Sequence, residues 1–334
     1  MSAVDFAARH WYRLSALSLA LVPLSLLFRL LAAMRRAGYR AGVFKSARLA
    51  VPVVVFGNLV AGGTGKTPLV IWSAELLRAH GRRPGIVLRG HGGSATAAPR
   101  EVGPGDDAGL VGDEALLLAG RAGCPVWACA DRAAAARALL RRHPDCDVIL
   151  ADDGLQHYAL QRDLEIAVED ARGHGNGFML PAGPLREPAS RGVDATVVNA
   201  PPEQPPAGRA PGAVFHMQLV PQGWATPDGR AVERAELAGR RLHAVAGIGN
   251  PGRFFDTLRA MGLDPVTHVF ADHHAYTASD LDFRDCDLVL MTEKDAVKCR
   301  SFGRSDLMAL RVAAEPDAAF ADFLLKALHG FSPA

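Results

Sequence analysis

Cysteine is scarce in this sequence, and the few cysteines form no pattern. The 334 residues contain five of them, an odd number without a closely spaced pair. This scarcity argues against a disulfide framework or a zinc site and favours a reducing compartment. No internal repeat is evident either. Because 49% of the residues are apolar and 22% are charged, we expect an ordered globular protein, long enough for two lobes.

The chain as a whole also lacks an excess of either charge, but its charges are unevenly placed. The net charge is +2, whereas residues 1–50 hold eight basic side chains against a single acid, Asp5. That segment therefore carries about +7 and the rest about −5. A basic arm on an acidic body argues against nucleic-acid binding and indicates that the arm alone meets an anionic membrane surface. No pattern points to an obligate protein partner.

The basic arm contains a long apolar run from Leu14 to Ala33. Aromatic and basic residues precede the run and basic residues follow it, as is typical of a headgroup boundary. The polar and charged positions share one stripe of a predicted helix: Ser18, Ser25, Arg29 and Arg36.

Four interpretations of this run are open. A cleaved signal peptide conflicts with the basic cluster that follows the run. A spanning helix would have to carry Arg29 and kink at Pro23. A third interpretation is an ordinary helix buried in the protein core. A helix lying in the membrane interface accommodates both the polar stripe and the basic flanks, so residues 1–48 are predicted to form a membrane-associated anchor.

A phosphate-binding loop is predicted after the β-branched strand Val51–Phe56. Glycines let consecutive backbone N–H groups point at one phosphate, and a helix follows the loop to about residue 80. Lys66 would reach the β- and γ-phosphates, and the Thr67 hydroxyl would join the shell of a Mg²⁺ ion. Val60 stands where the strict pattern has glycine, so we expect a different shape at the start of the loop. The predicted binding residues are Gly62, Gly63, Thr64, Gly65, Lys66 and Thr67.

Asp152 and Asp153 end an apolar run that starts near Cys146. A carboxylate at the end of a strand beside a phosphate loop can hold Mg²⁺ directly or through water, although a solvated turn is the alternative. The alternation of strands and helices predicts an α/β fold of the P-loop NTPase type, with a doubly wound, mostly parallel sheet. Ligands of such a sheet collect at the carboxyl ends of its strands. Further elements are predicted at Arg83–Leu88, Val126–Ala128 and Arg132–His143.

Four segments are predicted along the chain: the anchor 1–48, a P-loop core 49–200, a linker with a β-ribbon 201–232, and a second, smaller α/β lobe 233–334. Proline and glycine crowd residues 199–212, which indicates a connector. The run Gly247–Gly252 ends a strand and opens a helix, but it lacks the G-x-G-x-x-G spacing. A dinucleotide site is therefore not expected there.

Further motifs are spread along the chain to about residue 300: Gly57-Asn58, Gly62–Pro68, Arg89–Gly93, Gly112–Glu114, Asp152–His157, Leu180–Glu187, Asp272–His274 and Met291–Lys298. In this order they resemble the lipid A 4'-kinase (tetraacyldisaccharide 4'-kinase) family. Two of them, Leu180–Glu187 and Thr292–Lys298, are not general nucleotide motifs, so the combination is specific. Ala115 and His91 stand where the family often has proline and tyrosine.

The resemblance implies an enzyme that uses ATP and Mg²⁺ to phosphorylate the 4'-hydroxyl of a tetraacylated glucosamine disaccharide lipid. It also implies a location at the cytoplasmic face of the inner membrane. A membrane-associated regulatory ATPase or GTPase switch is the alternative, and a non-enzymatic adaptor with a relic nucleotide site is a further one. The switch would need neither an N-terminal membrane helix nor an acceptor site, and the intact Lys66, Thr67 and Asp152 argue against a relic site.

The resemblance further implies roles for individual residues. Asp113 and His273 match an acid–histidine pair that helps deprotonate the sugar hydroxyl, and Lys66 assists the transfer. Thr67, Asp152 and Asp153 match positions near the metal. Gln156, Arg186 and Glu187 match further site positions. Taken singly, Asp113 is as readily a helix N-cap and His273 a loop histidine, and Thr292–Asp295 is either a base-reading loop or a helix cap with surface charges.

Overall fold

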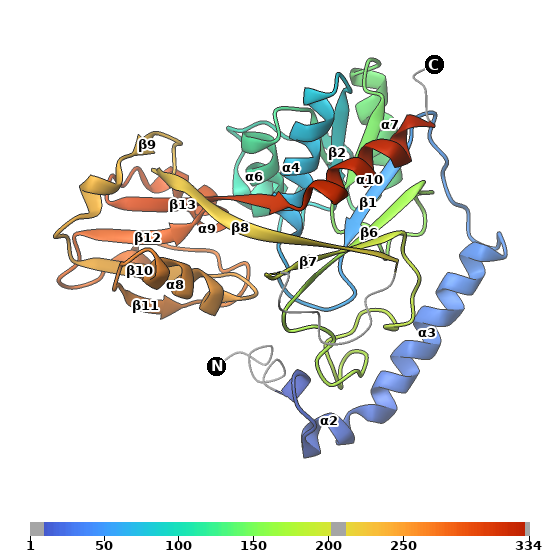
Figure 1. The fold of residues 1–334 in the computed structure, drawn as a ribbon, viewed down its shortest axis with the longest axis horizontal. Helices are drawn as coiled ribbons and strands as arrows, with labels where there is room; N and C mark the ends of the chain where they lie inside the picture. Colours follow the sequence, from blue (N-terminus) through green and yellow to red (C-terminus); the bar gives the residue numbers. More distant parts are fainter. Residues whose placement is uncertain (1–9, 202–211, 331–334) are drawn as a thin grey trace.

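The computed structural model describes residues 10–201 and 212–330, which form two lobes on one continuous sheet of 13 strands (Figure 1). The strands of the first lobe are β1 (Val53–Gly57), β2 (Pro84–Leu88), β3 (Arg100–Glu101), β4 (Val126–Ala128), β5 (Val148–Ala151), β6 (Leu164–Asp170) and β7 (Ala195–Asn199). The helices of this lobe are α4 (Lys66–Ala79), α5 (Ala108–Val111), α6 (Asp113–Arg121), α7 (Arg132–Arg142) and α10 (Ala318–His329).

The second lobe is smaller. Its strands are β8 (Ala213–Ala225), β9 (Ala231–Val232), β10 (Leu242–Ala246), β11 (Val266–Val269), β12 (Leu288–Thr292) and β13 (Leu307–Pro316). Its helices are α8 (Pro251–Ala260), α9 (Glu293–Cys299) and three short 3₁₀ turns, Arg234–Leu237, Ala278–Leu281 and Arg300–Phe302.

The sheet confirms the predicted doubly wound, mostly parallel arrangement. Its order is β11-β10-β12-β13-β8-β7-β6-β1-β5-β2-β4-β3, and β9 pairs with β8. All neighbouring pairs are parallel except β3–β4, β8–β13 and β8–β9. Because β1 lies between β5 and β6, the loop after β1 opens beside the carboxyl ends of both neighbours.

Helices on both faces explain why β1 is apolar throughout. Val54 and Phe56 belong to a core on one face of the sheet, and Val53 and Val55 belong to a core on the other. A strand with two buried faces has no polar alternation, as is usual in parallel sheets. The core beneath α4 and α10 therefore fixes the position of the strand from which the phosphate loop departs.

Two long strands join the lobes. β8 begins beside β7 in the first lobe and ends beside β9, while β13 begins beside β12 and leads back into α10. Figure 1 shows them crossing between the lobes as an antiparallel pair. The ribbon predicted from Val214–Val220 and the turn at Pro227–Gly229 corresponds to β8, the turn after it and β9, and β8 is a strand that both lobes share. Most of the predicted connector, residues 202–211, lies outside the described residues.

The predicted N-terminal helix is broken into α2 (Ala16–Ala20) and α3 (Val22–Arg40), with Pro23 in the first turn of α3. The serines of the polar stripe face the protein: Ser18 and Ser25 are buried, and the Ser25 hydroxyl donates to the Met179 carbonyl at 2.7 Å. The outward face is apolar instead and exposes Leu19, Leu24, Leu26, Leu27, Leu30, Leu31 and Met34. Among the described helices, none combines the length and the hydropathy needed to cross a bilayer.

Candidate active site

The predicted phosphate loop connects β1 to α4 with Lys66 as the first helical residue. Gly65 has a φ of +96°, and a Cβ there would collide with the Asn199 amide, which donates to the Thr64 carbonyl at 3.0 Å. The valine that replaces glycine at position 60 forms an isolated β-bridge with Leu185. The start of the loop is therefore held by strand-like pairing, for which a β-branched residue is suited.

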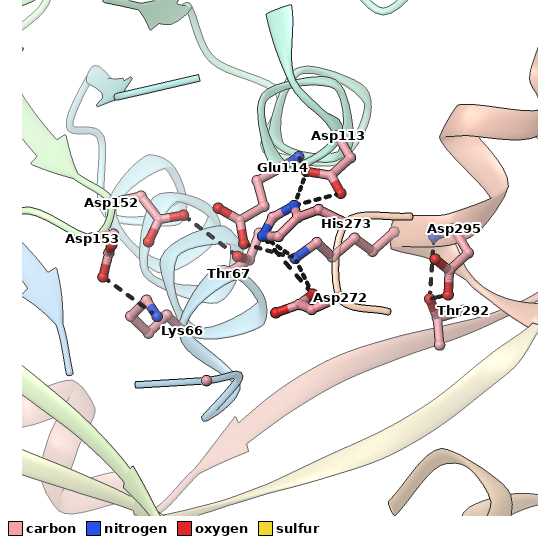
Figure 2. Close-up of polar contacts among 12 residues, drawn as sticks. Lys66, Thr67, Asp113, Glu114, Asp152, Asp153, Asp272, His273, Thr292 and Asp295 are labelled. Carbon is pink, nitrogen blue, oxygen red and sulfur yellow. Dashed lines mark hydrogen bonds and ion pairs between the residues drawn. The ribbon is translucent and has the colours of Figure 1, made fainter. Parts of the chain in front are cut away.

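Lys66 rests against Asp153, with 3.5 Å between its ammonium and the carboxylate (Figure 2). Arg186 donates to both oxygens of the same carboxylate at 3.1 Å, and Arg132 donates to the Asp153 carbonyl at 2.8 Å. Burial raises the pKa of Asp153, but Lys66, Arg186 and Arg132 outweigh it and hold that pKa far below its usual range. Asp153 is thus an ionised counterion for the cations of the site.

Asp152, at the end of β5, is the carboxylate that fits a metal. It is 1% exposed, and the Thr67 hydroxyl donates to its Oδ2 at 3.4 Å. Its Oδ1 is buried and has no hydrogen-bond partner among the described residues. Burial, and then the charge of Glu114, raise the pKa of Asp152 to about 7. A cation beside this orphaned oxygen would keep the carboxylate ionised, so Thr67 and Asp152 fit Mg²⁺.

No cluster of three or more histidine, cysteine or acidic side chains among residues 10–201 and 212–330 could hold a metal by itself. A Mg²⁺ ion held by a nucleotide keeps waters and phosphate oxygens and takes only one or two protein ligands.

Asp113 and His273 are brought together from different lobes. His273 Nδ1 lies 3.0 Å and 3.2 Å from the two Asp113 carboxylate oxygens (Figure 2). Asp113 is the first residue of α6, which Gly112 caps, so the N-cap alternative for Asp113 is wrong. Burial raises the pKa of Asp113, but His273 and Lys294 lower it below its usual value. The hydrogen bond to Asp113 raises the pKa of His273.

Lys294, to which the sequence analysis gave no role, completes this cluster. Its ammonium lies 3.1 Å from Glu114, 3.3 Å from His273 Nε2 and 3.5 Å from Asp272. Burial lowers the pKa of Lys294, but Glu114, Asp113 and Asp272 together raise it. A proton on His273 Nδ1, held by Asp113, leaves Nε2 as an acceptor, and the Lys294 ammonium occupies this acceptor here. The only sequence signal for Lys294 was its place in the motif Met291–Lys298.

For Thr292–Asp295 the structure confirms the predicted helix cap but not the surface charges that were expected with it. Thr292 caps α9 by accepting from the Asp295 backbone. Asp295 is no surface charge, because it is fully buried and accepts from the Gly247 backbone at 3.1 Å and from the Thr292 hydroxyl at 2.7 Å. The cap therefore ties α9 to the turn that follows β10.

Two cavities open from the phosphate loop. The larger, about 860 Å³, contains the histidine of the Asp113–His273 pair and reaches α3, where Phe28, Leu31, Ala32 and Arg35 line it. The smaller, about 470 Å³, lies between the lobes and has apolar walls that include Ile71, Ile248, Phe254, Leu310 and Val312. The remaining predicted site residues, Gln156, Arg186 and Glu187, line the larger cavity.

Gln156 and Glu187 are fixed by their neighbours. The Gln156 amide donates to the Asn58 carbonyl at 3.2 Å. Glu187 accepts from the Tyr158 hydroxyl at 2.7 Å and 2.8 Å and pairs with Arg191 at 3.0 Å. Both side chains therefore shape the wall of the larger cavity.

Comparison with known proteins agrees with this geometry. The family model for tetraacyldisaccharide-1-P 4'-kinase (LpxK) matches residues 17–329. The tetraacyldisaccharide 4'-kinase of Azoarcus sp. (strain BH72) is 51% identical over 99% of this chain and 98% of its own, and that of Methylobacillus flagellatus is 48% identical over 96% and 95%. The crystal structure of LpxK from Aquifex aeolicus in complex with ATP, 28% identical, has a TM-score of 0.79 over 94% of this chain and 100% of that chain. This chain belongs to the tetraacyldisaccharide-1-P 4'-kinase family.

Proposed function

We propose that this chain transfers the γ-phosphoryl group of ATP to the 4'-hydroxyl of a tetraacylated glucosamine disaccharide 1-phosphate, in lipid A biosynthesis. The observation that carries the proposal is that the two cavities meet. A nucleotide in the smaller cavity would present its γ-phosphate to an acceptor in the larger one. The residues that line both cavities are Gly63, Lys66, Glu114 and Lys294.

The nucleotide half of the site consists of the phosphate loop and the apolar space between the lobes. The base would lie against Ile248 and Phe254, and the phosphates would lie on the loop amides. Lys66 would exchange its contact with Asp153 for the β- and γ-phosphates. Thr67 and Asp152 would hold Mg²⁺, which neutralises phosphate charge when bound.

The acceptor half uses the Asp113–His273 pair. A sugar hydroxyl is a poor nucleophile near neutral pH, so a positioned base accelerates its attack. Nε2 of His273 would accept the hydroxyl proton once Lys294, which contacts it at 3.3 Å, has turned to the transferring phosphate. Asp113 would stabilise the imidazolium that forms, 3.0 Å away. Lys294, Lys66 and Arg186 would surround the negative charge of the transferring group. A regulatory ATPase switch has no need of this second cavity.

The outward face of α3 suits a membrane surface. Its exposed leucines form one apolar side, and Arg29, Arg35 and Arg40 supply the positive charge that anionic lipids attract. Phe28 and Leu31 also line the larger cavity, so acyl chains could remain in the bilayer while the sugar enters. This face supports the proposal that the protein is attached to the cytoplasmic face of the inner membrane through α3.

A transfer assay tests the function directly. The protein is incubated with γ-labelled ATP, Mg²⁺ and tetraacyldisaccharide 1-phosphate in detergent micelles, and the labelled products are separated. We expect the label in the glycolipid. Label found only as free phosphate would instead identify an ATPase switch, and the absence of any adenine-nucleotide binding by calorimetry would remove the proposal altogether.

The anchor can be tested separately by replacing Leu26 and Leu30 with serine. Both side chains are more than half exposed, at 58% and 56%, and neither lines a cavity. Loss of this apolar area should weaken sedimentation with vesicles containing anionic lipid by about ten- to a hundredfold. Leu110→Ser, at an exposed leucine on α5, is the matched control and should bind as the wild type does. Equal binding by all variants would mean that another surface attaches the protein.

A further inference from the structure

The turn Gly247–Gly252, which carries no dinucleotide fingerprint, lies directly on the phosphate loop. A Cβ placed on Gly249 would collide with the backbone nitrogen of Gly63. Only a glycine allows the two backbones to approach this closely. The turn and the first residues of α8 consequently form part of the wall of the smaller cavity, opposite the loop.

Arg253, in the first turn of α8, contributes its side chain to the wall of the smaller cavity. It lines the smaller cavity together with Gly63–Thr67 and lies 3.5 Å from Asp170 at the end of β6. Its side chain forms no other hydrogen bond or ion pair with the residues that the structure describes, and 32% of it is exposed. Most of its five N–H donors are thus available to a ligand.

Asp170 cannot pair fully with the Arg253 guanidinium, because Arg172 already donates hydrogen bonds to both oxygens of the Asp170 carboxylate. Arg172 donates to the Asp170 carboxylate through Nε, at 3.0 Å to both oxygens, and through Nη2 at 2.7 Å. Asp170 is 1% exposed, so one buried carboxylate faces two guanidinium groups. The group of three carries a net charge of +1 beside the phosphate loop, and a bound anion would balance it.

Arg172 also orients the loop itself. Its Nη2 donates to the Gly63 carbonyl at 2.8 Å. In a trans peptide the next N–H points away from that carbonyl, so the Thr64 N–H is directed away from Arg172. Asp170 therefore holds two side chains. One is Arg172, which sets the direction of the Thr64 N–H, and the other is Arg253, which comes from the second lobe.

We propose that Arg253 binds the non-transferred phosphates of the nucleotide, α or β, and that Asp170 holds its guanidinium ready for them. Arg253 lines the smaller cavity but not the larger one where the acceptor would lie, which separates it from the γ-phosphate. Contacts to the non-reacting phosphates stabilise the ground state and the transition state alike. They lower KM and leave kcat nearly unchanged. This inference rests on the proposed kinase function for its ligand.

The test compares Arg253→Ala, Arg253→Lys and Arg259→Ala by calorimetry with MgADP and with a non-hydrolysable MgATP analogue. Arg259 lies on the same helix, is 57% exposed and serves as the control. We expect Arg253→Ala to lower the affinity for both nucleotides by at least about tenfold, because a charge-assisted contact with a phosphate is lost. Arg253→Lys should lose less affinity, because lysine keeps the positive charge although it lacks the paired N–H donors of the guanidinium. Arg259→Ala should match the wild type.

Turnover separates this inference from the kinase proposal. At saturating ATP, kcat of Arg253→Ala should stay within about threefold of the wild type while KM for ATP rises. Unchanged affinities in folded Arg253→Ala, or weakened binding of the ATP analogue with normal binding of ADP, would overturn the assignment. Arg253→Ala could lower the affinity for both nucleotides while the wild type phosphorylates no disaccharide lipid. In that case the contact between Arg253 and the phosphates is supported and the kinase proposal fails.

Discussion

Replacing Lys66 with alanine is expected to slow phosphoryl transfer by at least about 100-fold, because removing one preorganised contact to transition-state charge costs about 10²–10³ in kcat. The Lys66 side chain is only 12% exposed and its ammonium is already positioned between the phosphate loop and Asp153. No other side chain on α4 could supply the same charge, since the next basic residue of that helix is Arg78, near its end. The measurement is the initial rate of label transfer from γ-labelled ATP.

The variant should remain folded. Asp153 keeps its two contacts with Arg186 at 3.1 Å, so the loss of Lys66 does not leave a buried carboxylate unpaired. Thermal unfolding would check this point. Lys326→Ala, at an exposed lysine of α10, is the matched control and should transfer at the wild-type rate. Full activity in Lys66→Ala would show that the loop does not hold the reacting phosphates.

The first lobe could be predicted from sequence because its signals are local. The β-branched run before Gly57 and the glycines before Lys66 lie within a few residues of each other. Strand, loop and helix follow from that spacing alone, and the parallel sheet follows from the alternation of such units. Family membership was likewise evident from motifs in a fixed order, and the comparisons confirm it.

The connection between the lobes could not be predicted in the same way. β8 pairs with β13 over a register that joins Ala225 to Ala309 and Met217 to Pro316. Pairing between segments so far apart leaves no local pattern in either one. The start of β8 and the turn before β9 were evident as a short ribbon, but a single sheet through both lobes was not foreseen.

The same limit applies to the site. Asp113 and His273 are 160 residues apart, and only the family resemblance placed them together. The spacing of Ser18 and Ser25 put both serines on one side of the N-terminal segment, on α2 and α3, but it did not give the direction of that side, because a stripe with few polar groups can face either water or protein. Here the Ser25 hydroxyl finds a buried carbonyl, and the leucines remain outside. Nothing in the sequence indicated that Arg253 belongs to the site, because the turn before it, Gly247–Gly252, lacks the G-x-G-x-x-G spacing.

Replacing Asp113 with asparagine is expected to lower kcat by about 10²–10⁴-fold, the usual contribution of general acid–base catalysis. The amide cannot stabilise a protonated His273 as the carboxylate does at 3.0 Å. His273→Ala should lose a similar factor, and the double variant little more, because the two residues act as a unit. Asp264→Asn, at an exposed and remote aspartate, is the control for the substitution.

The pH dependence distinguishes this role from a purely structural one. His273 must be neutral to accept a proton, so the rate should fall as the pH drops through its pKa. In the wild type the hydrogen bond to Asp113 raises that pKa above the ordinary 6.5, against the opposing effects of burial and Lys294. Without the carboxylate those opposing effects prevail, so the acid limb of the rate profile should move to lower pH even as the maximal rate declines. An acid limb that stays where it was would mean that Asp113 does not act through His273.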